Sequence, residues 1–168
     1  RDTRPTSDRV REAIFNILGA PPESARVLDL YAGTGALGLE ALSRGAAQVV
    51  FVDRAAAAQK VLGANVAALR AGDRSTVLSM GADQALDQLL ARGDVFAWIF
   101  VDPPYRSDDA QQTLTRLGGT HARLLATDGR VVVEHDRRVV FAATYARLAQ
   151  SDTRRYGDTA VSIYQHVP

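Results

Sequence analysis

The fold is decided by one stretch of sequence, Val27-Leu28-Asp29-Leu30-Tyr31-Ala32-Gly33-Thr34-Gly35-Ala36-Leu37-Gly38. It predicts a short apolar strand, a loop that contains glycines, and the start of a helix. Glycines at a strand-to-helix turn let the backbone pass close to a ligand, and the helix N-terminus beyond them presents free N–H groups. The stretch therefore predicts a ligand site, although Gly33 and Gly35 alone are also compatible with a plain tight turn.

Further strands and helices alternate along the chain on both sides of this stretch. We expect a helix at 9–18, and strands, the first four each followed by a helix, at 26–31, 48–53, 75–79, 97–101 and 129–134. Such alternation is typical of a parallel sheet with helices on both faces. The pattern at 141–149 and 160–167 instead predicts a terminal antiparallel hairpin. We thus expect one α/β domain over 1–168 with a seven-stranded, mostly parallel sheet.

The composition limits the classes of protein to which the chain can belong. Its 168 residues, 46% of them hydrophobic, suit one domain with a full-sized core. The absence of cysteine excludes disulfides, thiolate metal ligands and a cysteine nucleophile. The three histidines show no metal-ligand spacing, so we expect no metal. No apolar run is long enough to cross a membrane, and the charged N-terminus is unlike a signal peptide, so we expect a cytoplasmic protein.

The arginines are distributed unevenly, although the formal net charge is only +1. All basic residues except Lys60 are arginines, and several gather near the two ends of the chain, at Arg1, Arg4, Arg9, Arg11, Arg137, Arg138, Arg147, Arg154 and Arg155. This bias is compatible with a GC-rich genome and equally with phosphate binding, for which forked guanidinium donors are suited. The chain begins at Arg1 without an initiator methionine, so we expect a leading segment to be missing from it.

Acidic residues accompany the first three predicted strands. Asp29 lies four residues before Gly33, where a carboxylate repels a pyrophosphate but suits a cation. S-adenosylmethionine carries an ammonium and a sulfonium group, so this acid favours it over a dinucleotide. Asp53 closes the second strand, where it can accept both hydroxyls of a ribose or cap the next helix. Asp83, after the third strand, can accept the adenine amino group or cap a helix.

A second site is predicted at the end of the fourth strand, in Ile99-Phe100-Val101-Asp102-Pro103-Pro104-Tyr105. The two prolines can continue neither a sheet nor a helix, so carbonyl groups and an aromatic ring remain available. Methylation of an exocyclic amino group is difficult because its lone pair is delocalised into the base. The Asp102 carboxylate and the Pro103 carbonyl can accept its N–H groups and redirect that lone pair, while Tyr105 stacks on a flipped-out base.

Four segments of the chain resemble the bacterial methyltransferase family of RsmD type, which modifies amino group N2 of a guanine in 16S ribosomal RNA. They are RPTSDRVREAIFN at 4–16, LDLYAGTGALGLEALSRGA at 28–46, FVDPPY at 100–105 and YGDTAVSIY at 156–164. The first and last are more specific than the glycine loop, which many methyltransferases share. The resemblance covers nearly the whole chain. It implies the class I, Rossmann-like methyltransferase fold with S-adenosylmethionine as cofactor.

The resemblance also implies roles for individual residues. The residues expected to bind the cofactor are Asp29, Ala32, Gly33, Thr34, Gly35, Asp53, Arg54, Ala82 and Asp83. The residues expected to hold the guanine are the catalytic motif Asp102, Pro103, Pro104 and Tyr105. An N-terminal helical segment within 1–20 is expected over the site, and the substrate-binding residues are expected to be Arg4, Thr6, Arg9, Arg11 and Arg106. Arg9 and Arg11 are also compatible with a solvated helix face. Family members usually carry a further basic N-terminal segment that this sequence lacks.

Three functions remain open on the sequence. The favoured hypothesis is an RNA methyltransferase that modifies guanine-N2 in 16S ribosomal RNA, either free or in a small-subunit particle. The alternative is a methyltransferase for adenine or another DNA base, because the Asp-Pro-Pro-Tyr motif serves adenine equally well. A catalytically silent binding module is disfavoured by the intact motif, and transfer to cytosine C5 by the absence of cysteine. We expect a monomer that does not bind membranes.

Overall fold

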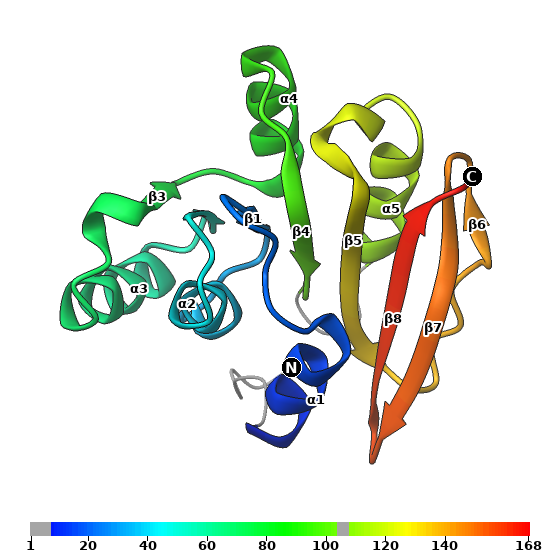
Figure 1. The fold of residues 1–168 in the computed structure, drawn as a ribbon, viewed down its shortest axis with the longest axis horizontal. Helices are drawn as coiled ribbons and strands as arrows, with labels where there is room; N and C mark the ends of the chain where they lie inside the picture. The colour runs from blue at the N-terminus through cyan, green and yellow to red at the C-terminus, as the bar shows by residue number, and fades with distance from the viewer. Residues whose placement is uncertain (1–7, 104–107) are drawn as a thin grey trace.

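One sheet runs through the computed structural model, which describes residues 8–103 and 108–168. Within these residues the sheet has eight strands in the order β3-β2-β1-β4-β5-β8-β7-β6 (Figure 1). The strands are β1 Arg26–Asp29, β2 Gln48–Val52, β3 Ser75–Leu78, β4 Phe96–Val101, β5 Leu125–Asp136, β6 Thr144–Tyr145, β7 Leu148–Tyr156 and β8 Thr159–His166. Strands β1 to β5 pair in parallel, whereas β8, β7 and β6 pair antiparallel.

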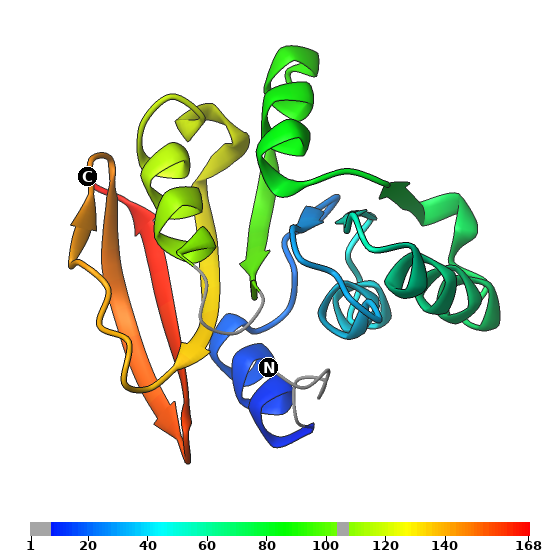
Figure 2. The same cartoon turned by 180° about the vertical axis from the view of Figure 1, so that it is seen from behind.

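Helices cover both faces of this sheet. In the described ranges they are α1 Asp8–Leu18, α2 Ala36–Ser43, α3 Ala56–Ala68, α4 Ala82–Arg92 and α5 Asp109–Gly118, with single turns at Gly72–Arg74 and Ala122–Leu124. Buried side chains of α1, α2 and α3 form a core on one face, and those of α4 and α5 form a core on the other. From behind, α5 lies in front of β5 (Figure 2). The predicted α/β class, with its parallel sheet and C-terminal hairpin, is confirmed.

The C-terminal part differs from the expectation in two respects. Residues 141–149 do not form one strand, because the chain reverses between β6 and β7, where Tyr145 pairs with Leu148. The reversal uses Ala146 at a φ of +52°, a conformation that residues other than glycine adopt rarely, so the local sequence does not indicate it. The two-residue β6 raises the number of strands in the described part of the chain from the expected seven to eight.

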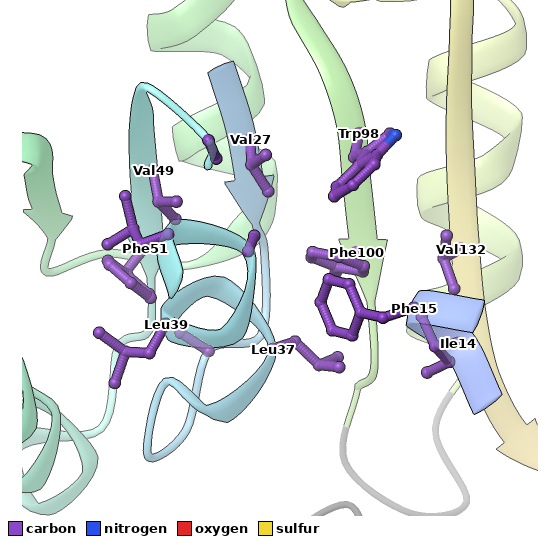
Figure 3. Packing of buried hydrophobic residues seen from close by; sticks show 14 of the residues in the cluster. Ile14, Phe15, Val27, Leu37, Leu39, Val49, Phe51, Trp98, Phe100 and Val132 are labelled. Atoms are coloured by element: carbon purple, nitrogen blue, oxygen red, sulfur yellow. The ribbon is translucent and has the colours of Figure 1, made fainter. Parts of the chain in front are cut away.

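Helix α1 packs on the sheet beside β4 (Figure 3). Its side chains Ile14 and Phe15 are fully buried. The centroid of the Phe15 ring lies 6.0 Å from that of Trp98 and 5.8 Å from that of Phe100, within the range of favourable aromatic pairs. The helix predicted at 9–18 is thus confirmed. Its Phe15 packs on Phe100, the last residue but one of β4, so the helix is anchored near the end of that strand.

Substitution of a glycine in α2, compared with one in α3, tests how closely α2 packs on the sheet. A Cβ atom added at Gly38 would lie 2.4 Å from Phe51 Cε1, whereas one added at Gly63 of α3 would meet nothing within 4 Å. We expect Gly38→Ala to lower the free energy of unfolding by about 1 to 3 kcal/mol through overpacking. The matched control Gly63→Ala should raise it by about 0.4 to 1 kcal/mol, because alanine favours the helix. Urea unfolding measures both, and equal effects would contradict this packing.

Candidate active site

Strands β1, β2 and β4 end side by side at the carboxyl edge of the sheet. Strand β1 lies in the middle, since Asp29 is in register with Phe51 of β2 on one side and with Phe100 of β4 on the other. The loop after β1 stays attached to β2, because the Ala32 N–H donates to the Val52 carbonyl at 2.9 Å. Ligands of open α/β sheets bind in the crevice at this edge. It is therefore the candidate active site.

The glycine loop makes a sharp turn between β1 and α2. Gly33 has a φ of +55° and Gly35 a φ of +87°, in the left-handed region that glycine adopts without strain. A Cβ atom at Gly35 would lie 2.3 Å from Leu62 Cδ1, whereas one at Gly33 would meet nothing within 4 Å. Gly35 thus lets the loop pack against α3, while the backbone at Gly33 has open space beside it for a ligand.

The Asp53 carboxylate connects this loop to β2. Its Oδ2 accepts the Gly33 N–H at 2.9 Å, and its Oδ1 accepts the Ala55 N–H at 2.8 Å. The second bond closes a turn of three residues, from Asp53 to Ala55. Ala55 itself is the N-cap of α3. An ionised carboxylate has about four acceptor positions. One position on each oxygen therefore remains for a ribose hydroxyl, so local turn formation and ribose binding are compatible.

Asp29 is an acid inside the core, with 2% of its surface exposed. Its Oδ2 accepts the Gly38 N–H of α2 at 3.1 Å. Burial raises the pKa of Asp29 to about 7; the hydrogen bond from Gly38 opposes this rise, and the nearby Asp53 carboxylate adds to it. The two carboxylates are thus close enough to repel each other. A cation bound beside them relieves that repulsion.

The third predicted cofactor acid lies on the α4 side of this edge. Ala82 begins α4 and Asp83 lies in its first turn, while a glycine is the N-cap and no side chain caps the helix. Asp83 is exposed, and its carboxylate lies 3.5 Å from Arg116 Nε. Tyr31 of the glycine loop lies in the same region. Burial raises the pKa of its phenol; the Asp83 charge raises it further, and Arg54 lowers it.

The end of β4 contributes Asp102 and Pro103, which are both half-buried. Because β4 is the neighbour of β1, Asp102 lies at the same edge of the sheet as the glycine loop. The structure thus brings Asp29, Asp53 and Asp102 to one edge. Five residues of the predicted catalytic and substrate-binding sets lie outside the described part of the chain, namely Arg4, Thr6, Pro104, Tyr105 and Arg106.

The two predicted substrate arginines of α1 have different surroundings. The Arg11 guanidinium lies 2.8 Å from Asp8 Oδ1 and 3.7 Å from Glu40 Oε1 of α2. Arg9 is exposed. Arg11 therefore ties α1 to α2, whereas Arg9 presents its charge to the solvent.

Two polar side chains that sequence reasoning missed, Gln59 and Asn65, hold the edge together. Gln59 of α3 donates to the Asp53 carbonyl at 2.7 Å and accepts the Ser79 hydroxyl at 2.9 Å, so it joins the ends of β2 and β3. Asn65 of the same helix donates to the Thr34 carbonyl at 2.9 Å. The sequence does contain a signal that could have pointed to these two residues, because both amides interrupt an otherwise mostly apolar helix.

The described residues contain neither a metal-binding cluster nor a helix that could span a membrane. Within 8–103 and 108–168, no group of three or more His, Asp or Glu side chains could hold a metal ion. No helix in these ranges is both long and apolar enough to cross a membrane.

A parallel sheet of order 3-2-1-4-5, continued by antiparallel strands, is the sheet of the class I methyltransferases. A solved structure of YhhF from Escherichia coli, described provisionally as a methyltransferase, matches it with a TM-score of 0.81. The two proteins are 35% identical, and the match covers 97% of this chain and 87% of that one. The fold therefore defines a methyltransferase.

Sequence comparison identifies the family. The family model described as conserved hypothetical protein 95 matches residues 1–165. YlbH of Bacillus subtilis, described provisionally as an rRNA methyltransferase, is 39% identical over 97% of this chain and 88% of its own. Ribosomal RNA small subunit methyltransferase D of Escherichia coli is 35% identical over 96% of this chain and 79% of its own. The chain belongs to this family, the RsmD family, and the resemblance found in the sequence is confirmed.

S-adenosylmethionine is the cofactor that this edge has to fit. The mutual repulsion of Asp29 and Asp53 is relieved by a cationic ligand. The remaining acceptor positions of Asp53 suit the two hydroxyls of a ribose. The open space at Gly33 admits a ligand close to the backbone. The described residues therefore fit this cofactor.

Asp29 makes the stability of the protein depend on pH. Its carboxyl group ionises near 3.8 in the unfolded chain and near 7 in the folded protein. As pH rises from about 4 to 7, the unfolded chain loses this proton first, so this group lowers the free energy of unfolding by about 4 kcal/mol. Asp29→Asn cannot ionise and should lack this fall. Urea unfolding of both proteins from pH 4 to 8 measures the difference, and a difference that does not vary with pH would contradict the raised pKa.

Proposed function

We propose that this protein transfers the methyl group of S-adenosylmethionine to amino group N2 of a guanine in small-subunit ribosomal RNA. The observation that carries the proposal is the position of Asp102 at the end of β4, beside β1 and the glycine loop. An acceptor for a base amine then lies next to the candidate cofactor site. The relative named for the ribosomal RNA of the small subunit favours RNA over DNA as the substrate.

In this proposal the cofactor lies along the carboxyl ends of β1 and β2. The Asp29 carboxylate attracts its ammonium group, the two oxygens of Asp53 accept the ribose hydroxyls, and Asp83 accepts the adenine amine. The other residues proposed to line the cofactor are Ala32, Gly33, Thr34, Gly35, Arg54 and Ala82. When bound, the cofactor supplies an electrophilic methyl group on its sulfonium.

The Asp102-Pro-Pro-Tyr motif holds the base. The Asp102 carboxylate and the Pro103 carbonyl accept the N–H groups of the exocyclic amine, which turns its lone pair away from the ring and toward the methyl carbon. Tyr105, with Pro104 before it, stacks on the flipped-out base. Alignment of the amine with the methyl carbon supplies much of the rate enhancement.

The N-terminal segment contributes to RNA binding in this proposal. Its support is the packing of Phe15 on Phe100, which holds α1 beside β4, the strand that Asp102 follows. The exposed Arg9 contacts a phosphate. Arg11 instead forms an ion-pair contact with Glu40 of α2 and so fixes the position of α1. The remaining residues proposed to bind the substrate are Arg4, Thr6 and Arg106.

Transfer of a labelled methyl group tests the substrate class. Labelled S-adenosylmethionine is incubated with the protein and, side by side, with small ribosomal subunits, free small-subunit ribosomal RNA and duplex DNA. We expect label in a ribosomal substrate and none in DNA. Label in DNA alone would contradict the proposal.

The variant Asp102→Ala tests whether the carboxylate acts as an acceptor for the base amine. It should lose methyl transfer by at least about 100-fold, because the amine loses its charged acceptor. Its affinity for the cofactor, measured by calorimetry, should stay within about two-fold of that of the wild type. Turnover close to that of the wild type would refute the acceptor role of Asp102.

A further inference from the structure

Four arginines gather at the end of the β7–β8 hairpin, and the proposed reaction does not use them. Arg137 and Arg138 follow β5 directly, and Arg154 and Arg155 lie near the end of β7. The register brings the two pairs together, because the ends of β5 and β7 both pair with Thr159, the first residue of β8. We call these four arginines the arginine tip.

Hydrogen bonds fasten the loop after β5 to the hairpin turn. The Arg137 N–H donates to the Asp158 carbonyl at 2.9 Å, and the Arg137 guanidinium donates to the Gly157 carbonyl at 3.3 Å. The Arg138 N–H donates to Asp136 Oδ1 at 2.8 Å. The arginine tip is therefore a defined part of the fold.

Two aspartates lie beneath their arginine partners. The Arg138 side chain is 73% exposed, whereas Asp136, 2.8 Å away, is 14% exposed. The Arg154 side chain is 54% exposed and Asp152, 3.1 Å away, is 34% exposed. In both pairs the arginine side chain is more exposed to solvent than the aspartate side chain. The aspartates orient the arginines outward and leave them accessible.

The other two arginines of the tip are also exposed, and a neighbouring valine adds apolar surface. Arg137 and Arg155 are exposed, and no ion pair between described residues involves either of them. Val140 is 85% exposed in the loop that follows the first two arginines. One acid, Asp158, is also exposed at the turn. Exposed guanidinium groups beside an apolar side chain suit RNA, which presents phosphates together with the faces of unpaired bases.

The arginine tip lies at the same edge of the sheet as Asp102. Strands β4 and β5 run parallel, with Val101 opposite Val133, and β5 continues to Asp136 (Figure 1). In the strand order β4-β5-β8-β7, the two arginine pairs lie one and three strands away from β4. The tip is therefore about 5 to 15 Å to the side of β4, because neighbouring strands are about 4.8 Å apart. An RNA strand whose target base reaches Asp102 can therefore extend over the tip.

We propose that the arginine tip binds phosphates of the RNA strand a few nucleotides away from the target guanine. This inference rests on the proposed function, since it needs an RNA whose target base lies at Asp102. Forked guanidinium groups match phosphate oxygens in geometry and charge. Contacts of this kind supply affinity and position without reading the sequence. The tip thus contributes to RNA affinity and not to cofactor affinity.

The double variant Arg137→Ala/Arg155→Ala tests this inference. We expect its Kd for free small-subunit ribosomal RNA to rise about ten-fold at 0.15 M salt, while its Kd for S-adenosylmethionine stays unchanged. The plot of log Kd against log salt concentration should become shallower by about 1.5, because each lost phosphate contact removes about 0.7 to 0.9 from the slope. A purely structural role does not change this slope.

The matched control is Arg123→Ala/Arg147→Ala, which removes the same charge from exposed positions away from the tip. It should leave the RNA affinity and the slope unchanged. Equal RNA affinity and slope in the tip variant and the wild type would overturn the inference. Weaker binding to whole subunits with unchanged binding to free RNA would also overturn it, since the tip would then contact a protein. Absence of methyl transfer by the wild type would instead refute the proposed function.

Discussion

The candidate active site depends on the hydrogen bond from the Gly33 N–H to the Asp53 carboxylate, 2.9 Å long. This bond fixes the loop after β1 against the end of β2, and the bond from the Gly38 N–H to Asp29 fixes the start of α2 against β1. Each bond satisfies a backbone donor that the turn would otherwise leave without a partner, at a cost of about 1 to 3 kcal/mol if buried. The same two bonds also hold Asp29 and Asp53, the two acids proposed to bind the cofactor. Loop shape and site chemistry therefore depend on each other.

The packing of α1 extends this arrangement to the substrate side. Phe15 packs on Phe100 of β4, and the Arg44 guanidinium of α2 lies 4.9 Å from the centroid of the Phe15 ring. Arg11 adds an ion-pair contact with Glu40 of α2. Helix α1 is thus held by β4, which Asp102 follows, and by α2, which follows the glycine loop. The exposed Arg9, which is proposed to contact RNA, is thereby held near both parts of the site.

Features that depend on local backbone geometry could be predicted from the sequence. The spacing of the glycines and of the acids at strand ends can be recognised in the sequence. It predicted that Asp29, Gly33 and Asp53 belong to one site, and the structure places them at one edge of the sheet. Features that depend on contacts distant in sequence could not be predicted. Gln59 joins two strand ends that only the fold brings together, and Ala146 adopts a turn that its residue type does not favour.

The identity of the methylated nucleoside tests the central claim most directly. Small-subunit RNA labelled by the protein is digested to nucleosides, which are separated and identified by mass spectrometry. A carboxylate and a carbonyl that hold an exocyclic amine predict label on an amine of this kind, and the proposed guanine substrate predicts that the product is N2-methylguanosine. Label on a ring carbon, on a ribose hydroxyl or on adenine would contradict the account.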